Sequence, residues 1–180
     1  MATHSTTRTL VVVFVALAIV ASACASATVD KAPAPGNVGG IGAAELAPRF
    51  SVPTNSGEIF SLQEHLSDDG RPLFLNLWAS WCFPCREEMP DIDAASKRFP
   101  EIMFIGVAIQ DSRSESEKFL DEVQVSYLIG FDTDDMVDRA YSPIGLPATY
   151  IISSEGVILD RILGKLTEEQ IAEEFAVHFG

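Results

Sequence analysis

The apolar positions of this chain fall into short blocks that alternate between strand and helix periodicity from about residue 49 onward. Residues 73–78 and 102–109 are apolar at nearly every position, which is typical of central strands covered on both faces. Three further strands are expected at 128–131, 148–152 and 157–163. The last two are expected to be joined by a tight hairpin turn at 153–156. This order predicts an α/β fold with a partly parallel sheet.

Apolar residues at helical spacing predict the helices that follow these strands. Within the first helix, over 84–99, Pro90 is expected to kink the helix without ending it. Capping boxes at Ser114-x-x-Glu117 and Thr167-x-x-Gln170 predict where two later helices begin. The remaining expected elements are a hairpin over 49–61, a helical turn at 62–66 and a short helix at 135–141.

The N-terminal region has a different pattern. Residues 1–9 carry one arginine and no acid, and Leu10–Val20 is an unbroken apolar run too short to cross a bilayer. Small residues follow, so we expect an export signal over residues 1–23. Residues 24–45, rich in proline and glycine, are expected to form a flexible tether to one folded domain over 46–180.

Cys24 is a candidate lipidation site. Ala21-Ser22-Ala23-Cys24 resembles the lipobox of bacterial lipoproteins, although Ala21 stands where a bulky aliphatic residue is usual. A lipidated Cys24 would be the mature N-terminus and would attach the protein to a membrane. Ala21 and Ala23 also suit ordinary signal peptidase, which would leave Cys24 unpaired. Because an unpaired thiol is a liability in an oxidising compartment, lipidation is favoured.

The chain is strongly acidic. It has 12 Lys and Arg against 26 Asp and Glu, a formal net charge of −14. This charge disfavours binding to nucleic acid and to anionic lipid surfaces. Solubility is its simplest consequence, and attraction to a basic protein such as an apocytochrome is an alternative.

The segment Cys82-Phe83-Pro84-Cys85 is the candidate chemistry. Two cysteines separated by two residues close a small disulfide ring, and Pro84 limits the freedom of that ring. At a helix start, backbone N–H groups and the positive end of the helix dipole stabilise a Cys82 thiolate. We expect Cys82 to be an exposed, acidified nucleophile and Cys85 to be more buried. The pattern predicts reversible dithiol–disulfide exchange with no cofactor.

Three segments together resemble a known family. Residues 76–90 look like the active site of thioredoxin-like proteins, and residues 145–152 resemble the loop that carries their cis-proline. Residues 131–141 resemble the central insertion of the extracytoplasmic TlpA/ResA/DsbE-type members. The resemblance covers 46–180. It implies a thioredoxin-like fold: a mixed central sheet flanked by helices, with an N-terminal hairpin and a central helix–strand insertion.

The resemblance also implies roles for particular residues. Cys82 and Cys85 are the expected catalytic, redox-active disulfide. Glu88 is a third expected catalytic residue, because an acid at this place is thought to tune the cysteines in TlpA/ResA-type reductases. The alternative is that Glu88 is an ordinary surface acid. Asn76, which does not titrate, stands where thioredoxin has a buried Asp. The residues expected to bind substrate are Trp81, Pro84, Leu146 and Pro147, the last after a cis peptide.

The resemblance favours a reductase of disulfides in partner proteins, with the haem-site cysteines of apocytochrome c as one candidate. A membrane thiol-relay protein is the expected electron donor, and nothing in the sequence requires more than a monomer. Relatives of this fold span reduction potentials from about −270 mV to about −120 mV, so a disulfide oxidase or isomerase is the alternative.

Metal binding is an alternative of another class. Two thiolates with His65 or His178 could bind copper or zinc, but neither histidine is near the motif in sequence, so no metal ligand is expected. Asp132, Asp134 and Asp135 lack the spacing of a calcium loop, and helix capping explains them better.

Overall fold

The computed structural model describes residues 44–180. The expected export signal, Cys24 and nearly all of the expected tether lie outside these described residues, so their assignments stay predictions. Among residues 44–180, every helix is too short or too polar to cross a bilayer.

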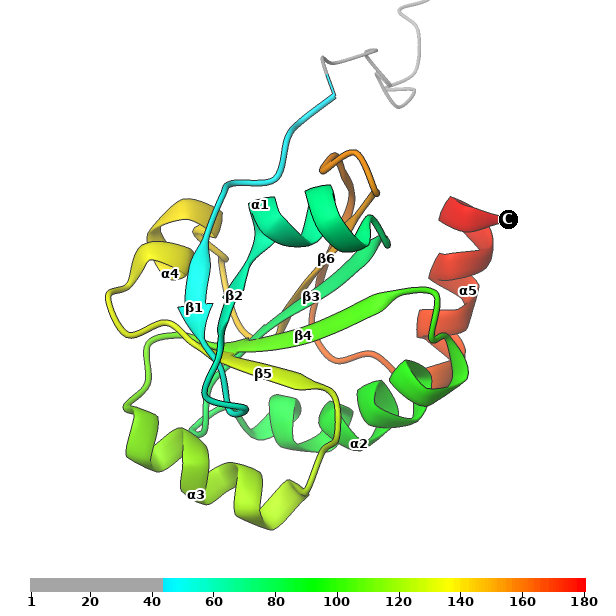
Figure 1. Cartoon of the computed structure of the whole chain (residues 1–180). Helices are drawn as coiled ribbons and strands as arrows, with labels where there is room; N and C mark the ends of the chain where they lie inside the picture. Colours follow the sequence, from blue (N-terminus) through cyan, green and yellow to red (C-terminus); the bar gives the residue numbers. More distant parts are fainter. Residues whose placement is uncertain (1–43) are drawn as a thin grey trace, which may run out of the picture. The chain divides into compact units, whose positions relative to one another are not determined.

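A five-stranded sheet in the order β5-β4-β3-β6-β7 forms the centre of the domain (Figure 1). β3 (Leu73–Trp78) and β4 (Met103–Ala108) are parallel, and β5 (Leu128–Phe131) extends the parallel part. β6 (Ala148–Ile152) runs antiparallel to β3, and β7 (Ile158–Leu163) runs antiparallel to β6 and forms an edge. The predicted mixed sheet is confirmed.

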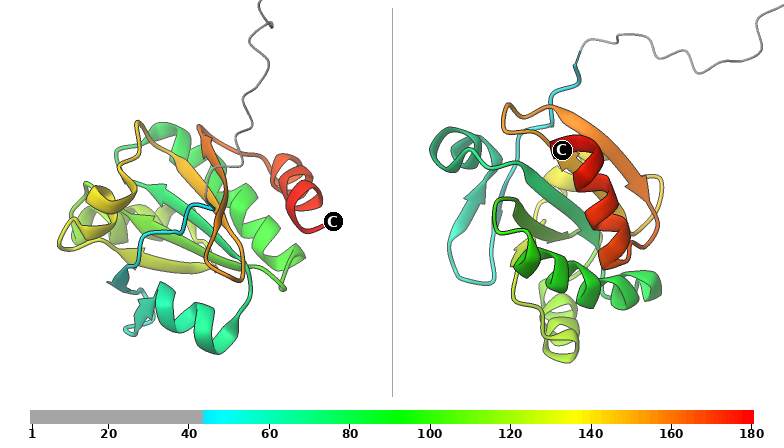
Figure 2. Two further views of the ribbon diagram at one scale, coloured as in Figure 1. Left: turned by 90° about the horizontal axis from the view of Figure 1, so that it is seen from above. Right: turned by 90° about the vertical axis from the view of Figure 1, so that its right-hand side faces the viewer.

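Three helices cover one face of this sheet (Figures 1 and 2). They are α2 (Phe83–Arg98), α3 (Arg113–Val123) and α5 (Glu168–Phe179). Alternate residues of β3, beginning with Phe74, point into the core on this side, where they meet Met89 of α2 and Phe175 of α5. β3 is buried along its whole length because its other residues face a second core.

The second core lies under the remaining elements. These are the hairpin β1 (Ser51–Pro53) and β2 (Ile59–Ser61), α1 (Leu62–Glu64), its π-helical continuation η1 (His65–Asp69), and α4 (Met136–Tyr141). Leu75 and Leu77 of β3 pack here against Phe50 and Tyr141. The hairpin is confirmed, and the expected turn at 62–66 is longer than predicted because η1 extends it to Asp69.

Of the two predicted capping boxes, one is confirmed. Thr167 and Gln170 form the predicted capping box of α5. The prediction for α3 is wrong: its N-cap is Ser112, whose hydroxyl accepts the Glu115 N–H at 3.3 Å. Ser112-x-x-Glu115 matches the same motif two residues earlier, and Ser114 is inside the helix. α2 continues past Pro90 to Arg98, so that proline does not end it, as predicted.

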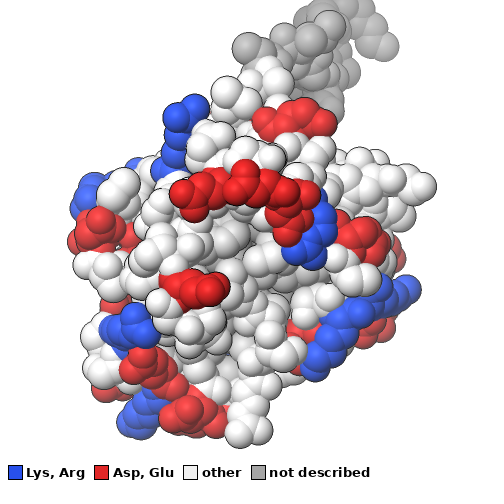
Figure 3. Space-filling model, in the orientation of Figure 1, with Lys and Arg blue, Asp and Glu red and all other residues white. Residues whose placement is uncertain are grey.

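Charged side chains of both signs are interspersed on the face seen in Figure 3. Several basic residues of the domain pair with an acid, as Arg86 does with Glu122 and Arg113 with Glu117. Such exposed pairs contribute little to stability, typically up to about 1 kcal/mol. The excess of acids over bases keeps the surface negative.

Candidate active site

The two cysteines form a disulfide with an S–S distance of 1.97 Å at the start of α2. Cys82 is the N-cap residue, and its Sγ accepts the Cys85 backbone N–H at 3.2 Å. Pro84 lies in the first helical turn, where its missing N–H costs little. The sulfur of Cys82 therefore faces the N–H groups of the helix, as the sequence predicts. Backbone N–H groups and the positive end of a helix dipole are groups that stabilise a thiolate, and the acidity of Cys82 in the reduced protein stays a prediction.

Burial differs between the two cysteines but less than expected. Cys85 is fully buried, whereas Cys82 is 4% exposed. The expectation of an exposed Cys82 is wrong for this oxidised form, because the N-cap position and the closed ring hold its sulfur against the core. Its neighbours Trp81 and Phe83 are 61% and 69% exposed. The disulfide thus lies just beneath an exposed aromatic rim, with Cys82 as its more accessible end.

The loop before Cys82 is held by the loop that follows β4. The Ser80 N–H donates to Asp111 Oδ2 at 2.7 Å, and the Trp81 Nε1–H donates to the Gln110 carbonyl at 3.1 Å. Asp111 also accepts the Ser116 hydroxyl of α3. This anchor is absent from the expectations drawn from the sequence. The position of Asp111 in the sequence could have indicated this contact. Asp111 shortly follows β4, which is parallel to β3, so its carboxylate lies at the sheet edge where β3 also ends.

The Leu146–Pro147 peptide is cis, which confirms the predicted geometry of this loop. Pro147 is buried and comes directly before β6, whose first residue, Ala148, pairs with Leu77 of β3. This register brings Pro147 to the end of the sheet at which β3 leads into the disulfide. Leu146, half-buried, packs against the core cluster that contains both cysteines. The roles of Leu146 and Pro147 in substrate binding stay predictions.

Glu88 is fully buried, so the alternative of an ordinary surface acid is wrong. Its Oε1 accepts from Asn76 Nδ2 at 2.9 Å, and its Oε2 accepts the Leu166 backbone N–H at 3.1 Å. By contrast, the adjacent Glu87 is exposed and pairs with Lys165. Helix α2 therefore turns one acid outward and the next one into the core, on the helix that also carries Cys85.

Burial raises the pKa of Glu88 to about 7, although the hydrogen bonds from Asn76 and Leu166 oppose this shift. An ordinary glutamate titrates near pH 4.3. Glu88 therefore changes charge close to neutral pH, one helical turn after Cys85. Groups whose pKa is displaced in this way are concentrated at functional sites.

Two further residues belong to this buried polar group and were not expected from the sequence. Thr149 Oγ1 accepts from Asn76 Nδ2 at 3.2 Å, linking β3 to β6. The pKa of Tyr127 is raised well above its usual range by burial and by the nearby Glu88 charge. The contact between Thr149 and Asn76 could have been expected from the sequence. Both are isolated polar residues within otherwise apolar strands, and buried polar groups are nearly always hydrogen-bonded.

The two histidines of residues 44–180 face groups away from the disulfide. His65 Nε2 lies 2.9 Å from the Arg71 carbonyl oxygen, and His178 Nε2 faces the carboxylate of Asp160. The aspartates after β5 behave partly as predicted. The carboxylate of Asp132 accepts the N–H groups of residues 137 and 138 at the start of α4, which is capping. Asp135, the N-cap residue, makes no side-chain cap.

A thioredoxin-like fold with a closed dithiol at a helix start carries out thiol–disulfide exchange, and this is the class that the fold and the site define. The comparisons agree. The family model described as the AhpC/TSA family matches residues 43–161. The chain belongs to this thioredoxin-like family and, within it, to the thiol-disulfide oxidoreductases of the TlpA/ResA/DsbE type.

Individual relatives are between a quarter and a third identical to the chain over the aligned segments. The Thioredoxin-like protein YneN of Bacillus subtilis is 33% identical over 75% of this chain and 79% of its own. The thiol-disulfide oxidoreductase ResA of the same organism is 30% identical over 69% of each. A solved structure of a DsbE-like interchange protein from Chlorobium tepidum has a TM-score of 0.67 at 25% identity, covering 76% of this chain and 95% of that one.

Proposed function

We propose that this thiol-disulfide oxidoreductase works as a reductase of disulfides in partner proteins outside the cytoplasm. One observation supports the exchange chemistry: the Sγ of Cys82 is the N-cap acceptor of α2. This placement stabilises a thiolate relative to a thiol, and a thiolate attacks other disulfides at neutral pH. The proposed direction, reduction of the partner, rests on the resemblance to the TlpA/ResA-type reductases.

The reaction begins with the reduced protein. The Cys82 thiolate attacks one sulfur of the partner's disulfide, and the other partner sulfur leaves as a thiolate that takes up a proton. The Cys85 thiol then loses its proton and attacks Cys82 in the mixed disulfide, which releases the second partner sulfur and closes the bond seen here. Two electrons pass to the partner, and a membrane thiol-relay protein returns two electrons to the Cys82–Cys85 pair.

The exposed rim is the proposed binding surface for the partner's chain. Trp81 and Phe83 stand out on either side of Cys82 and offer apolar contact area. Pro84 presets the turn between the cysteines, and the backbone at Leu146 and Pro147 pairs with the extended substrate. Exposed aromatic residues beside a reacting atom are typical of surfaces that bind proteins.

Glu88 is proposed to tune the dithiol. When protonated, Glu88 places no charge near the pair; when ionised, it disfavours a second negative charge on Cys85. The protein then releases or takes up a proton at Glu88 as the dithiol changes state. In Glu88→Gln, the reduction potential should lose the part of its pH dependence that lies around pH 7. An unchanged dependence would remove this role.

The proposed location rests on the N-terminal pattern. Export through residues 1–23 and lipidation of Cys24 would attach the protein to the outer side of a membrane, where the proposed thiol-relay donor would also lie. Mass analysis of the mature protein tests this. A diacylated Cys24 at the N-terminus supports the anchor, and a mature chain that starts after Ala23 with an unmodified Cys24 contradicts it. Apocytochrome c is the candidate substrate.

The reduction potential separates a reductase from an oxidase. The protein is equilibrated in glutathione buffers of defined ratio, and the free thiols of Cys82 and Cys85 are alkylated and counted by mass. A reduction potential of about −270 mV supports the reductase, and one of about −120 mV overturns it in favour of an oxidase. A Cys85→Ser variant should accumulate the mixed disulfide through Cys82, whereas the matched Cys82→Ser variant should not.

A further inference from the structure

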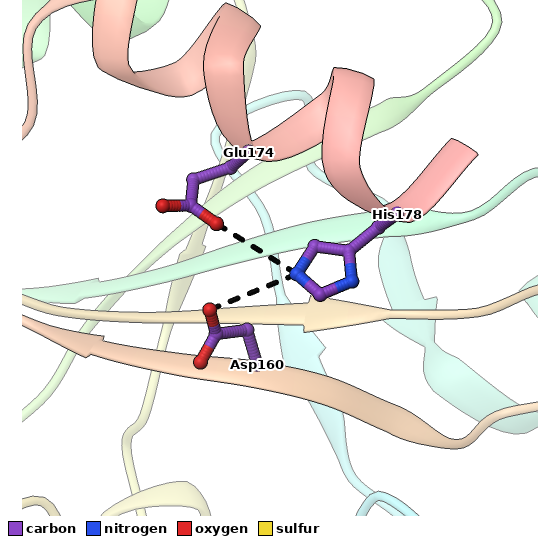
Figure 4. A group of neighbouring side chains, drawn as sticks. All are labelled: Asp160, Glu174 and His178. Carbon is purple, nitrogen blue, oxygen red and sulfur yellow. Dashed lines mark ion pairs between the residues drawn. The ribbon is translucent and has the colours of Figure 1, made fainter. Parts of the chain in front are cut away.

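Three metal-ligating side chains converge at a place that the proposed redox chemistry does not use (Figure 4). Asp160 lies on the edge strand β7, and Glu174 and His178 lie one turn apart on α5. His178 Nε2 is 3.7 Å from Asp160 Oδ2 and 3.7 Å from Glu174 Oε2. The three ligand atoms all lie within 4.8 Å of one another.

Direct hydrogen bonds do not account for this geometry. An N–H···O hydrogen bond is about 2.7–3.2 Å long, so both distances from His178 are too long for one. The Nε2 atom is nevertheless buried and has no hydrogen-bond partner among the described residues. Asp160 is already oriented by its other oxygen, which accepts the Arg161 backbone N–H at 2.6 Å. The buried Nε2 of His178 therefore has space between itself and the two carboxylates for a bound metal ion.

The spacing suits a small divalent cation. Tetrahedral zinc binds imidazole nitrogen and carboxylate oxygen at about 2.0–2.2 Å, which places neighbouring ligand atoms about 3.4 Å apart. The two distances from His178 are within a few tenths of an ångström of this value. The side chains of Asp160 and Glu174 are 40% and 32% exposed, so the site is open to solvent. Two carboxylates also neutralise a divalent charge.

We propose that Asp160, Glu174 and His178 bind one divalent transition-metal ion of the zinc type, with water in the fourth position. The imidazole favours such an ion over magnesium or calcium, which prefer oxygen ligands alone. The ion joins the last turn of α5 to β7. Glu168 begins α5 close to Leu166, the partner of Glu88, whereas His178 lies about 15 Å further along the helix axis. The site is therefore independent of the dithiol.

Calorimetric titration of the untagged full chain with zinc chloride tests the proposal. The disulfide is kept oxidised and Cys24 is alkylated, so thiolates contribute no ligands. We expect one zinc ion per chain, undisturbed by excess magnesium. His178→Ala and Glu174→Gln should each weaken binding by at least about tenfold. Glu173→Gln, which removes the same charge from the exposed neighbouring residue, should bind zinc as the unmodified chain does.

Thermal melts separate loss of a ligand from loss of the fold. In the presence of a chelator, the Glu174→Gln variant should melt within a few degrees of the unmodified chain. Zinc should then raise the melting temperature of the unmodified chain and of Glu173→Gln, because a ligand that binds only the folded state stabilises it, and should leave Glu174→Gln unchanged. The proposal is overturned if about 100 μM zinc does not bind the unmodified chain, or if both ligand variants bind it equally well.

Discussion

Replacing Glu88 by Gln should make the stability of the oxidised protein less sensitive to pH. The carboxyl group of Glu88 is fully buried and has a pKa of about 7, against about 4.3 in an unfolded chain. Between these two values the folded state binds a proton that the unfolded state has released. The stability provided by the protonated group is therefore present at pH 4 and is lost as the pH rises toward and through 7.

The size of the effect follows from the shift. A difference of one pKa unit corresponds to about 1.4 kcal/mol, so the free energy of unfolding of the unmodified chain should lose about 3 kcal/mol at Glu88 between pH 4 and pH 8. The amide introduced by Glu88→Gln does not titrate. It also fits the site, because Asn76 Oδ1 has no partner among the described residues and accepts an amide N–H once the Asn76 side chain is turned over.

Urea unfolding of the oxidised protein, followed by circular dichroism at pH 4 and pH 8, measures this. For each protein, the free energy of unfolding at pH 4 is subtracted from that at pH 8. Because all other groups titrate alike in both proteins, the difference between these two changes isolates Glu88. Between pH 4 and pH 8, the free energy of unfolding of Glu88→Gln should rise by about 3 kcal/mol relative to that of the unmodified chain. Glu87→Gln, on the exposed side of α2, should gain almost nothing. A gain below about 0.5 kcal/mol for Glu88→Gln would refute the raised pKa.

Three further predictions concern the fold, and urea unfolding at pH 7 checks each. Thr167→Ala removes the capping box of α5 and should cost about 1 kcal/mol. Gly130→Ala puts a methyl group 2.6 Å from Val52 Cγ2 and should cost about 1–3 kcal/mol, while Gly145→Ala, whose added methyl group has its nearest neighbour at 3.5 Å, should change stability by less than about 0.5 kcal/mol. Asp132→Ala leaves two N–H groups of α4 without their acceptor and should cost about 1–3 kcal/mol. Equal stability of the two alanine-for-glycine variants would contradict the close contact of Val52 in β1 with Gly130 in β5.

The sequence predicted most elements because each carries a strong local signal. β3 is apolar at nearly every position since both of its faces are covered, and Thr167 and Gln170 satisfy each other's backbone at the start of α5. Local signals fail where two of them overlap. Ser112 and Ser114 each begin a capping motif, and the sequence alone does not say which serine lies outside the helix.

The site was predicted in part. The cysteine pair and the cis-proline loop were found from motif and resemblance, but the anchor at Asp111 and the partners of Glu88 depend on contacts across the sheet. Leu166, whose N–H donates to Glu88, is 78 positions further along the chain, so no local sequence pattern predicts this contact. The burial of Cys82 was missed for a related reason: a helix start is open in a peptide, and only the packed domain covers its sulfur.

The ionisation of the Cys82 thiol in the reduced protein tests the central claim most directly. The rate of alkylation of Cys82 is measured against pH in the Cys85→Ser variant, with peptide mapping to separate it from Cys24. The placement of Sγ at the start of α2 predicts a pKa at least about one unit below the value of about 8.5 for a free cysteine. A pKa of about 8.5 or above, or a sulfur that alkylating reagents do not reach, would contradict the account.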